Sequence, residues 1–238
     1  MTTSRDNTVH AVSSFAGAEE EFEAAWRDPN CTQFALPPLD VNKVLNEHFT
    51  VKPPIRFTRS MLWDMGLKKA WDPSTYISYL ASDGRSWGRH NLEEGCEGFF
   101  RSSVQTAWIS KERGQVLEDV FINRNEFLSH AYPGPPLTLR RILSLGRREM
   151  TNDKGEHLYA GHHQPLFHVE HGAGGTESEP LNAWRIVFLT ESNDQRFTEP
   201  FKQMIETGLL PGFLGIYIER DLHRQLMRLG LLNPSCYR

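Results

Sequence analysis

The longest segment with a helical apolar period lies near the C-terminus, and it constrains the fold more than any other part of the chain. Residues 196–230 read RFTEPFKQMIETGLLPGFLGIYIERDLHRQLMRLG. The second half of this segment carries one apolar stripe at helical spacing, formed by Leu214, Ile218, Leu222, Leu226 and Leu229. Gly and Pro near residues 208–212 interrupt the period, so we expect two helices or one kinked helix.

The segments before it are helical at first and then mostly extended. Apolar residues at helical spacing predict an amphipathic helix over Phe15–Trp26. Further helices are expected over 60–71 and, with Asp72 as N-cap and Pro73 in the first turn, from 73 to 80. Alternating patterns and turn residues predict strands at roughly 99–109, 116–121, 138–150, 157–170 and 183–189. We expect a Gly-rich connection at 83–98 and a flexible loop at 172–182.

This order of elements defines an α+β protein. A long C-terminal helix held by a curved antiparallel sheet is the helix-grip arrangement, and it would enclose an apolar cavity. We divide the chain into an N-terminal extension with a short amphipathic helix (residues 1–35), a single domain (36–232) and a tail (233–238).

Over residues 55–232 the order of elements resembles START-like, or polyketide-cyclase-like, domains. Three features are similar to the diacetylphloroglucinol-hydrolase type: Trp71-Asp72-Pro73 at a helix start, His168-Val169-Glu170-His171 before a Gly-rich loop, and a charged pair one helical turn apart near the C-terminus. The resemblance implies zinc-dependent cleavage of a carbon–carbon bond in a phenolic ketone. The chain departs from that family in having Asp72 and Tyr76 in place of two histidines, and in the order of the charged pair.

That charged pair, Glu219 and His223, is spaced four residues apart, so both side chains emerge on one helix face. This spacing suits two metal ligands, or a carboxylate that orients a general-base imidazole. The alternative is an ordinary exposed pair, because charged neighbours surround it.

The segment HLYAGHHQPLFHVEH holds five of the ten histidines of the chain. On a strand, His168 and Glu170 share one face and His171 points to the other. If the first face borders the cavity, His168 and Glu170 would join Glu219 and His223 in a zinc site with nitrogen and oxygen ligands. A metal-free acid/base role for a histidine and a purely surface location remain as alternatives.

Aromatic residues are spread over the elements expected to line the cavity, and they would suit a planar ligand. The substrate-binding candidates are Trp63, Trp71, Tyr76, Trp108 and Trp184, with His90 at the pocket mouth. An ordinary core uses the same residue types. The sequence Gly84-Arg85-Ser86-Trp87-Gly88 matches G-x-S-x-G, but that nucleophile needs a strand before it and a helix directly after it, which the pattern here does not predict.

Composition limits the partners and the cellular compartment that we expect for the protein. The net charge is -4 with both signs mixed along the chain, which argues against a nucleic-acid partner. No apolar run approaches the roughly 20 residues of a membrane span, and MTTSRDNTVHAVSSF lacks a signal-peptide core. Three distant cysteines without a CxxC motif indicate a reducing compartment, so we expect a cytoplasmic protein.

We therefore predict a small-molecule enzyme, a hydrolase, lyase or cyclase of secondary metabolism. It would act on an apolar, phenolic or polyketide-type compound through His168, Glu219 and His223, with or without zinc. One alternative is a ligand-binding domain without chemistry. Another is an interaction protein whose Phe15–Trp26 helix docks on a partner. Association as a homodimer is compatible with either.

Overall fold

The computed structural model describes residues 13–51, 54–106, 112–162, 164, 166–189 and 210–222. Its helices are α1 (Phe15–Arg27), α2 (Val41–His48), α3 (Arg59–Trp71), α4 (Pro73–Tyr76) and α6 (Leu210–Tyr217), the last continued by a π-helical segment, Ile218–Leu222. The strands are β1 (Thr32–Ala35), β2 (Leu39–Asp40), β3 (Ala81–Asn91), β4 (Cys96–Thr106), β5 (Arg113–Ser129), β6 (Leu137–Arg147), β7 (Glu149–Thr151), β8 (His157–Tyr159), β9 (Phe167–Gly175) and β10 (Pro180–Phe188).

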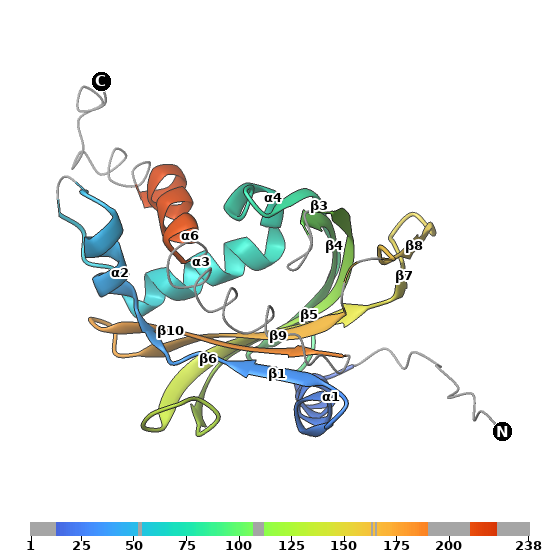
Figure 1. The fold of residues 1–238 in the computed structure, drawn as a ribbon, viewed down its shortest axis with the longest axis horizontal. Coiled ribbons are helices and arrows are strands. Elements are labelled where there is room, and N and C mark those ends of the chain that lie inside the picture. The colour runs from blue at the N-terminus through green and yellow to red at the C-terminus, as the bar shows by residue number, and fades with distance from the viewer. Residues whose placement is uncertain are drawn as a thin grey trace.

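An eight-stranded antiparallel sheet forms the centre of the molecule. Its strand order is β1-β10-β9-β6-β5-β4-β3, and β2 also pairs with β10. The strands β7 and β8 form a separate hairpin beyond the end of β6. Helices α2, α3, α4 and α6 lie on one face of the sheet and α1 lies on the other (Figure 1). The α+β class and the antiparallel sheet predicted from the sequence are confirmed.

The face under α3 carries the larger core. Thr58 caps α3 by accepting a hydrogen bond from the backbone N–H of Met61. Residues three, four and seven positions apart lie on one face of the helix. This face packs on the sheet and buries Leu62 and Met65. A Cβ at Gly66 would lie 3.5 Å from Ile142 Cδ1, an ordinary contact distance, so α3 packs directly against β6 at this position.

The face under α1 carries a second core. Ser14 caps the helix by accepting from the backbone N–H of Gly17, and Phe15 and Phe22 are buried against Leu143 and Val187. Strands β6 and β9 are consequently buried on both faces. Such strands lose the alternation of apolar and polar residues that marks a strand with one solvent-exposed face.

The described residues do not form the predicted long C-terminal helix. The structure shows an eight-residue helix, α6, followed by five residues of π-helix, and no long helix wrapped by the sheet within residues 210–222. Leu210 and Phe213 pack into the core together with Trp63 and Trp184. The rest of the predicted helix, residues 196–209 and 223–230, lies outside the described residues.

Of the other elements predicted from the sequence, some are confirmed by the structure and some are wrong. The predicted helices near 15–26 and 60–71 are confirmed as α1 and α3. The predicted Gly-rich connection at 83–98 is wrong, because β3 runs through most of it with two register shifts and a positive φ at Gly88. The predicted loop at 172–182 is a short turn between β9 and β10, since Gly172 and Gly174 pair within the ladder. The division into an extension, a domain and a tail stays a prediction, although β1 pairs directly with β10.

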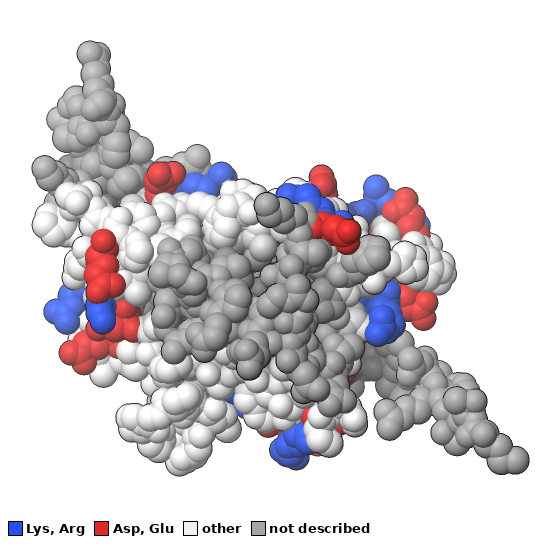
Figure 2. Space-filling view, in the orientation of Figure 1, with Lys and Arg blue, Asp and Glu red and all other residues white. Residues whose placement is uncertain are grey.

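The described helices include none that is long and apolar enough to cross a membrane. Acidic and basic side chains lie next to one another on the face drawn in Figure 2. That distribution agrees with the mixed charge of the sequence.

Candidate functional site

A lysine occupies the inward stripe of α3. Lys69 follows Leu62 by seven positions and Met65 by four, so the helix turns it toward the sheet. The residue is 7% exposed. Its Nζ lies 3.1 Å from Nδ1 of His171, which projects from β9 toward α3. The structure therefore places an amine and an imidazole in direct contact inside the molecule.

Two aromatic rings flank this pair. The Lys69 Nζ lies 4.5 Å from the ring centroid of Phe213 on α6 and 4.9 Å from that of Trp184 on β10. The Trp184 ring also meets His171 edge to face, with 4.6 Å between centroids. Nε1 of Trp184 is buried without a hydrogen-bond partner among the described residues. An indole N–H in this state is an available donor for a ligand oxygen.

An ion pair lies next to the amine. Arg101 on β4 binds Glu118 on β5 through Nε and Nη2, at 2.9 and 2.6 Å, and donates from Nη1 to the carbonyl oxygen of Ala70. Burial lowers the pKa of Lys69 well below its ordinary value, and the Arg101 charge lowers it further, whereas Glu118 opposes this. Burial, Lys69 and Arg101 likewise lower the pKa of His171. The environment therefore favours the uncharged form of both groups.

An unprotonated lysine keeps a free lone pair. Desolvation and a nearby cation are the usual means by which a protein turns a lysine into a base or a nucleophile. The adjacent imidazole can take up or return a proton over a single hydrogen bond. We name Lys69, His171, Trp184 and Phe213 the lysine box.

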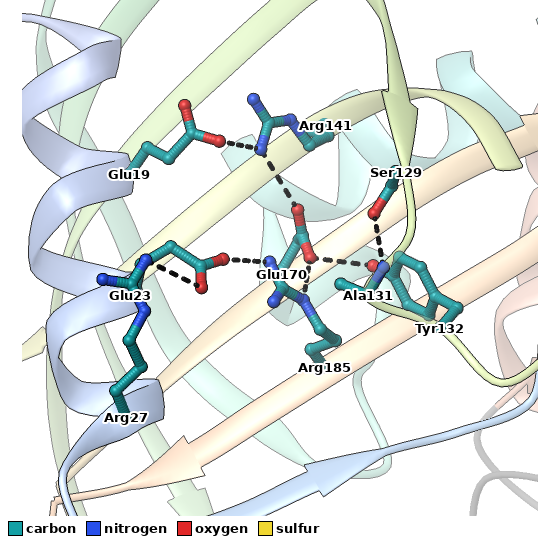
Figure 3. Close-up of polar contacts among 9 residues, drawn as sticks. All are labelled: Glu19, Glu23, Arg27, Ser129, Ala131, Tyr132, Arg141, Glu170 and Arg185. Carbon is teal, nitrogen blue, oxygen red and sulfur yellow. Dashed lines mark hydrogen bonds and ion pairs between the residues drawn. The ribbon is translucent and has the colours of Figure 1, made fainter. Parts of the chain in front are cut away.

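The predicted residues His168 and Glu170 share a face, as expected from strand geometry, but that face is the one under α1. Glu170 is fully buried there. Arg185 Nε and the Tyr132 hydroxyl donate to its Oε2 at 2.5 and 2.9 Å, and Arg141 Nη1 lies 3.6 Å from its Oε1 (Figure 3). Its Oε2 is thus hydrogen-bonded to a cation and a hydroxyl, whereas Oε1 lies near the Arg141 charge without a hydrogen bond from the described residues.

The guanidinium groups around Glu170 also hold α1. Arg141 donates to Glu19 at 2.5 Å and Arg185 to Glu23 at 2.7 Å (Figure 3). A neighbouring guanidinium, Arg147, pairs with Glu21 on the same helix. Acidic side chains of α1 therefore neutralise basic side chains of the sheet, and the geometry is that of a helix anchored by ion pairs.

His168 lies beside this network. Its Nδ1 accepts a hydrogen bond from the backbone N–H of Gly146 at 3.1 Å, and Nε2 is 3.6 Å from Glu21. Burial lowers the pKa of His168 to about 4, with Arg147 adding to the decrease and Glu21 opposing it. The ring is neutral at neutral pH and carries its proton on Nε2.

The predicted zinc ligands are not brought together in the described part of the chain. Glu219 is exposed in the π-helical segment after α6, on the face of the sheet opposite His168 and Glu170. His223 lies outside the described residues. Among the described residues, no group of three or more His, Cys, Asp or Glu side chains converges as metal ligands.

The predicted substrate-binding residues separate into three locations. Trp63 and Trp184 are buried in the core under α3. Trp71 and Tyr76 border a pocket of about 330 Å³, where Trp71 stacks edge to face on Phe99. His90 borders a pocket of about 650 Å³ that the structure forms elsewhere. Trp108 lies outside the described residues.

That larger pocket lies between β4, β5 and the β7–β8 hairpin. Its apolar wall is formed by Phe100, Phe121, Met150 and Tyr159, and its polar wall includes Asp119 and Arg147. Nε of Arg147 lies 2.7 Å from Oδ2 of Asp119, so the two side chains form an ion pair.

Ser86 of the G-x-S-x-G match sits on β3 and donates to the backbone carbonyl oxygen of Trp71 at 2.6 Å. A strand follows the serine instead of a helix, so the pattern is no nucleophile elbow, as the sequence indicated.

Lys69 and His171 were absent from the predicted site. A signal for Lys69 exists in the sequence, since a lysine stands on the apolar stripe Leu62-Met65 of a predicted helix. For His171, strand alternation predicts its face correctly, but the sequence does not say which face the helices cover.

No protein-family model matches the sequence, and no curated protein matches it. One solved structure with a similar chain path is that of dicamba monooxygenase bound to dicamba. The identity is 10% and the TM-score 0.43, over 88% of this chain and 54% of that one, so the chain spans about half the length of the structure that it matches.

The resemblance to START-like and diacetylphloroglucinol-hydrolase-type domains is wrong. No family model supports the resemblance, and residues 210–222 do not form the long helix that it implies. The reason is structural as well. The motifs that suggested the resemblance lie on opposite faces of the sheet. His168 and Glu170 lie under α1, whereas Trp71 and Glu219 lie on the other face.

Proposed function

We propose that the chain is a small-molecule enzyme that performs acid–base chemistry on an aromatic compound held at the lysine box. One observation carries this proposal. Lys69 and His171 are in direct contact at 3.1 Å, and burial together with Arg101 lowers the pKa of each. Placing a lysine there costs stability that a hydrocarbon side chain would not cost, which is a common property of sites kept for chemistry.

The surroundings suit a planar, largely apolar ligand. Phe213 and Trp184 offer ring faces, and the free Nε1–H of Trp184 offers one directional hydrogen bond. His171 is partly exposed although Lys69 is buried, which supports an opening beside the imidazole. The proposal covers hydrolase, lyase and cyclase reactions and does not choose among them. The predicted roles of His168, Glu219 and His223 stay predictions without support from this geometry.

The test compares turnover of phenols and aryl ketones by the full chain and its variants. Lys69→Met and His171→Phe are expected to lower the turnover of any responsive compound at least tenfold. Lys43→Met, on the exposed side of α2, serves as the matched lysine control and is expected to leave it unchanged. Full turnover by both site variants would overturn the proposal.

A second candidate function is ligand binding without chemistry, in the pocket of about 650 Å³. Its aromatic wall favours this function, and Arg147 in its polar wall is already paired with Asp119. Binding of phenols that is weakened by Tyr159→Ala and Met150→Ala, and not by Lys69→Met, would support it. Binding that depends on Lys69 alone would contradict it.

A further inference from the structure

We propose that the Lys69 amine forms a covalent imine with a small aromatic aldehyde or ketone, and that His171 transfers the proton in this step. The inference deepens the proposed function, on which it rests, by naming the substrate class as carbonyl compounds. It is built from the contacts of Lys69 and from what those contacts leave free.

The first argument is what Lys69 does not contact. Among the described residues no carboxylate pairs with its Nζ, whereas the preceding residue, Lys68, pairs with Asp64 and Asp221 at 2.7 and 3.3 Å. The nearest buried carboxylate, Glu118, is occupied by Arg101. An amine without a counterion in an apolar site stays neutral, and the neutral amine is the form that attacks a carbonyl carbon.

The second argument is what surrounds the position of the product. An imine carries a positive charge when protonated, and the faces of Phe213 and Trp184 lie 4.5 and 4.9 Å from the nitrogen. Aromatic faces stabilise a cation at this distance and do so more strongly in a desolvated site. The same rings accommodate an aryl group attached to the carbonyl carbon.

The third argument concerns the oxygen atom. Attack by the amine turns the carbonyl oxygen into an alkoxide, which needs hydrogen-bond donors. The structure leaves one buried donor free on a ring of the lysine box, Nε1 of Trp184. An imidazole nitrogen lies 3.1 Å from the amine and can carry a proton from nitrogen to oxygen.

The step balances without an external oxidant or reductant. The nitrogen lone pair forms the C–N bond while the C=O π bond becomes the oxygen lone pair. One proton moves from nitrogen through His171 to that oxygen, giving a carbinolamine. The remaining N–H proton then passes through His171 to the hydroxyl, which leaves as one water while the nitrogen lone pair forms the C=N bond. Hydrolysis reverses the sequence and frees Lys69.

The test is reductive trapping on the full chain. Wild-type protein is incubated briefly at neutral pH with benzaldehyde or acetophenone and sodium cyanoborohydride, and the product is read by intact mass and peptide mapping. We expect one adduct, located on Lys69, absent from Lys69→Met and retained in Lys43→Met. His171→Phe is expected to slow its formation at least tenfold.

Two outcomes overturn the inference and separate it from the proposed function. Label spread over exposed lysines, equally in wild type and Lys69→Met, contradicts the imine. If turnover of a phenol without a carbonyl group still depends on Lys69 and His171, the proposed function survives that result. If neither turnover nor trapping depends on these residues, both the imine inference and the proposed function are contradicted. The wild-type peptide map alone locates the adduct, so a poorly folded variant does not remove the test.

Discussion

At the scale of residues, the folded chain buries basic groups of lowered pKa on both faces of the sheet. Lys69 and His171 lie under α3, and His168 lies under α1. In each case burial is the largest cause of the lowered pKa. The two faces differ in what lies around these groups: aromatic rings, a free indole donor and one ion pair, Arg101–Glu118, under α3, and a network of several ion pairs under α1.

Lys69→Met is expected to stabilise the fold at neutral pH by about 1–3 kcal/mol, because it replaces a buried polar group by an apolar side chain of similar length. A lowered pKa in the folded chain means that unfolding takes up a proton below pH 10.5. The wild type therefore gains stability relative to the variant as the pH rises toward that value. Denaturant unfolding at pH 7 and pH 10 checks this, and a destabilised variant at pH 7 would contradict it.

His168 gives a second pH-dependent effect. Its pKa is lowered from 6.5 to about 4, so its contribution to stability is present above pH 6.5 and is lost as the pH falls toward 4. We expect the wild type to lose up to roughly 3 kcal/mol more than His168→Asn over this window, since each pKa unit corresponds to about 1.4 kcal/mol. Asparagine can still accept from Gly146. Parallel pH profiles of the two proteins would contradict the assignment.

Glu170→Gln is expected to cost about 3 kcal/mol of unfolding free energy, because it removes the charge that faces Arg185 and Arg141 in a fully buried position. Glu20→Gln on the exposed side of α1 is the control and should change stability by less than about 0.5 kcal/mol. Chemical denaturation measures both. Equal effects of the two substitutions would show that Glu170 is not the centre of the network.

At the scale of elements, α1 is joined to the sheet by both apolar and ionic contacts. Phe22 is 1% exposed, stacks near Trp26 and lies under the Arg185 guanidinium, 4.8 Å from ring centroid to Cζ. Glu19, Glu21 and Glu23 pair with basic residues of the sheet. Such a helix stabilises its own sheet, which disfavours the hypothesis that it docks on a partner.

Phe22→Ala is expected to destabilise the fold by about 3–5 kcal/mol, the usual cost of removing a fully buried phenyl ring. Glu20→Ala on the same helix is the matched control, since its side chain is exposed. Thermal or denaturant unfolding of both variants checks this. A loss below about 1 kcal/mol for Phe22→Ala would indicate that α1 is not part of the folded unit.

The sequence predicts elements here better than it predicts their partners. Apolar spacing places α1 and α3 within a residue or two. Glycines hide β3 and the end of β9, because glycine normally weakens a strand and only tertiary pairing overrides it. Which face of β9 the helices cover depends on contacts far apart in sequence. For that reason the interpretation chose His168, and the structure favours His171.

At the scale of the whole molecule, one sheet separates two environments. The α1 side buries charges in a satisfied network, apart from single atoms such as Arg141 Nε and Glu170 Oε1. The α3 side buries aromatic and aliphatic side chains around one amine of lowered pKa, with the Arg101–Glu118 ion pair beside it. Both layers are expected to unfold together, because β6 and β9 contribute side chains to each.

The protonation state of Lys69 is the most direct test of this account. Side-chain ¹⁵N and ¹³C NMR of the lysines, followed from pH 5 to pH 11 and assigned by loss of a signal in Lys69→Met, measures it. The account predicts one lysine that titrates well below the others, or stays neutral throughout. A Lys69 that titrates with the exposed lysines, near the ordinary value of about 10.4, would contradict it.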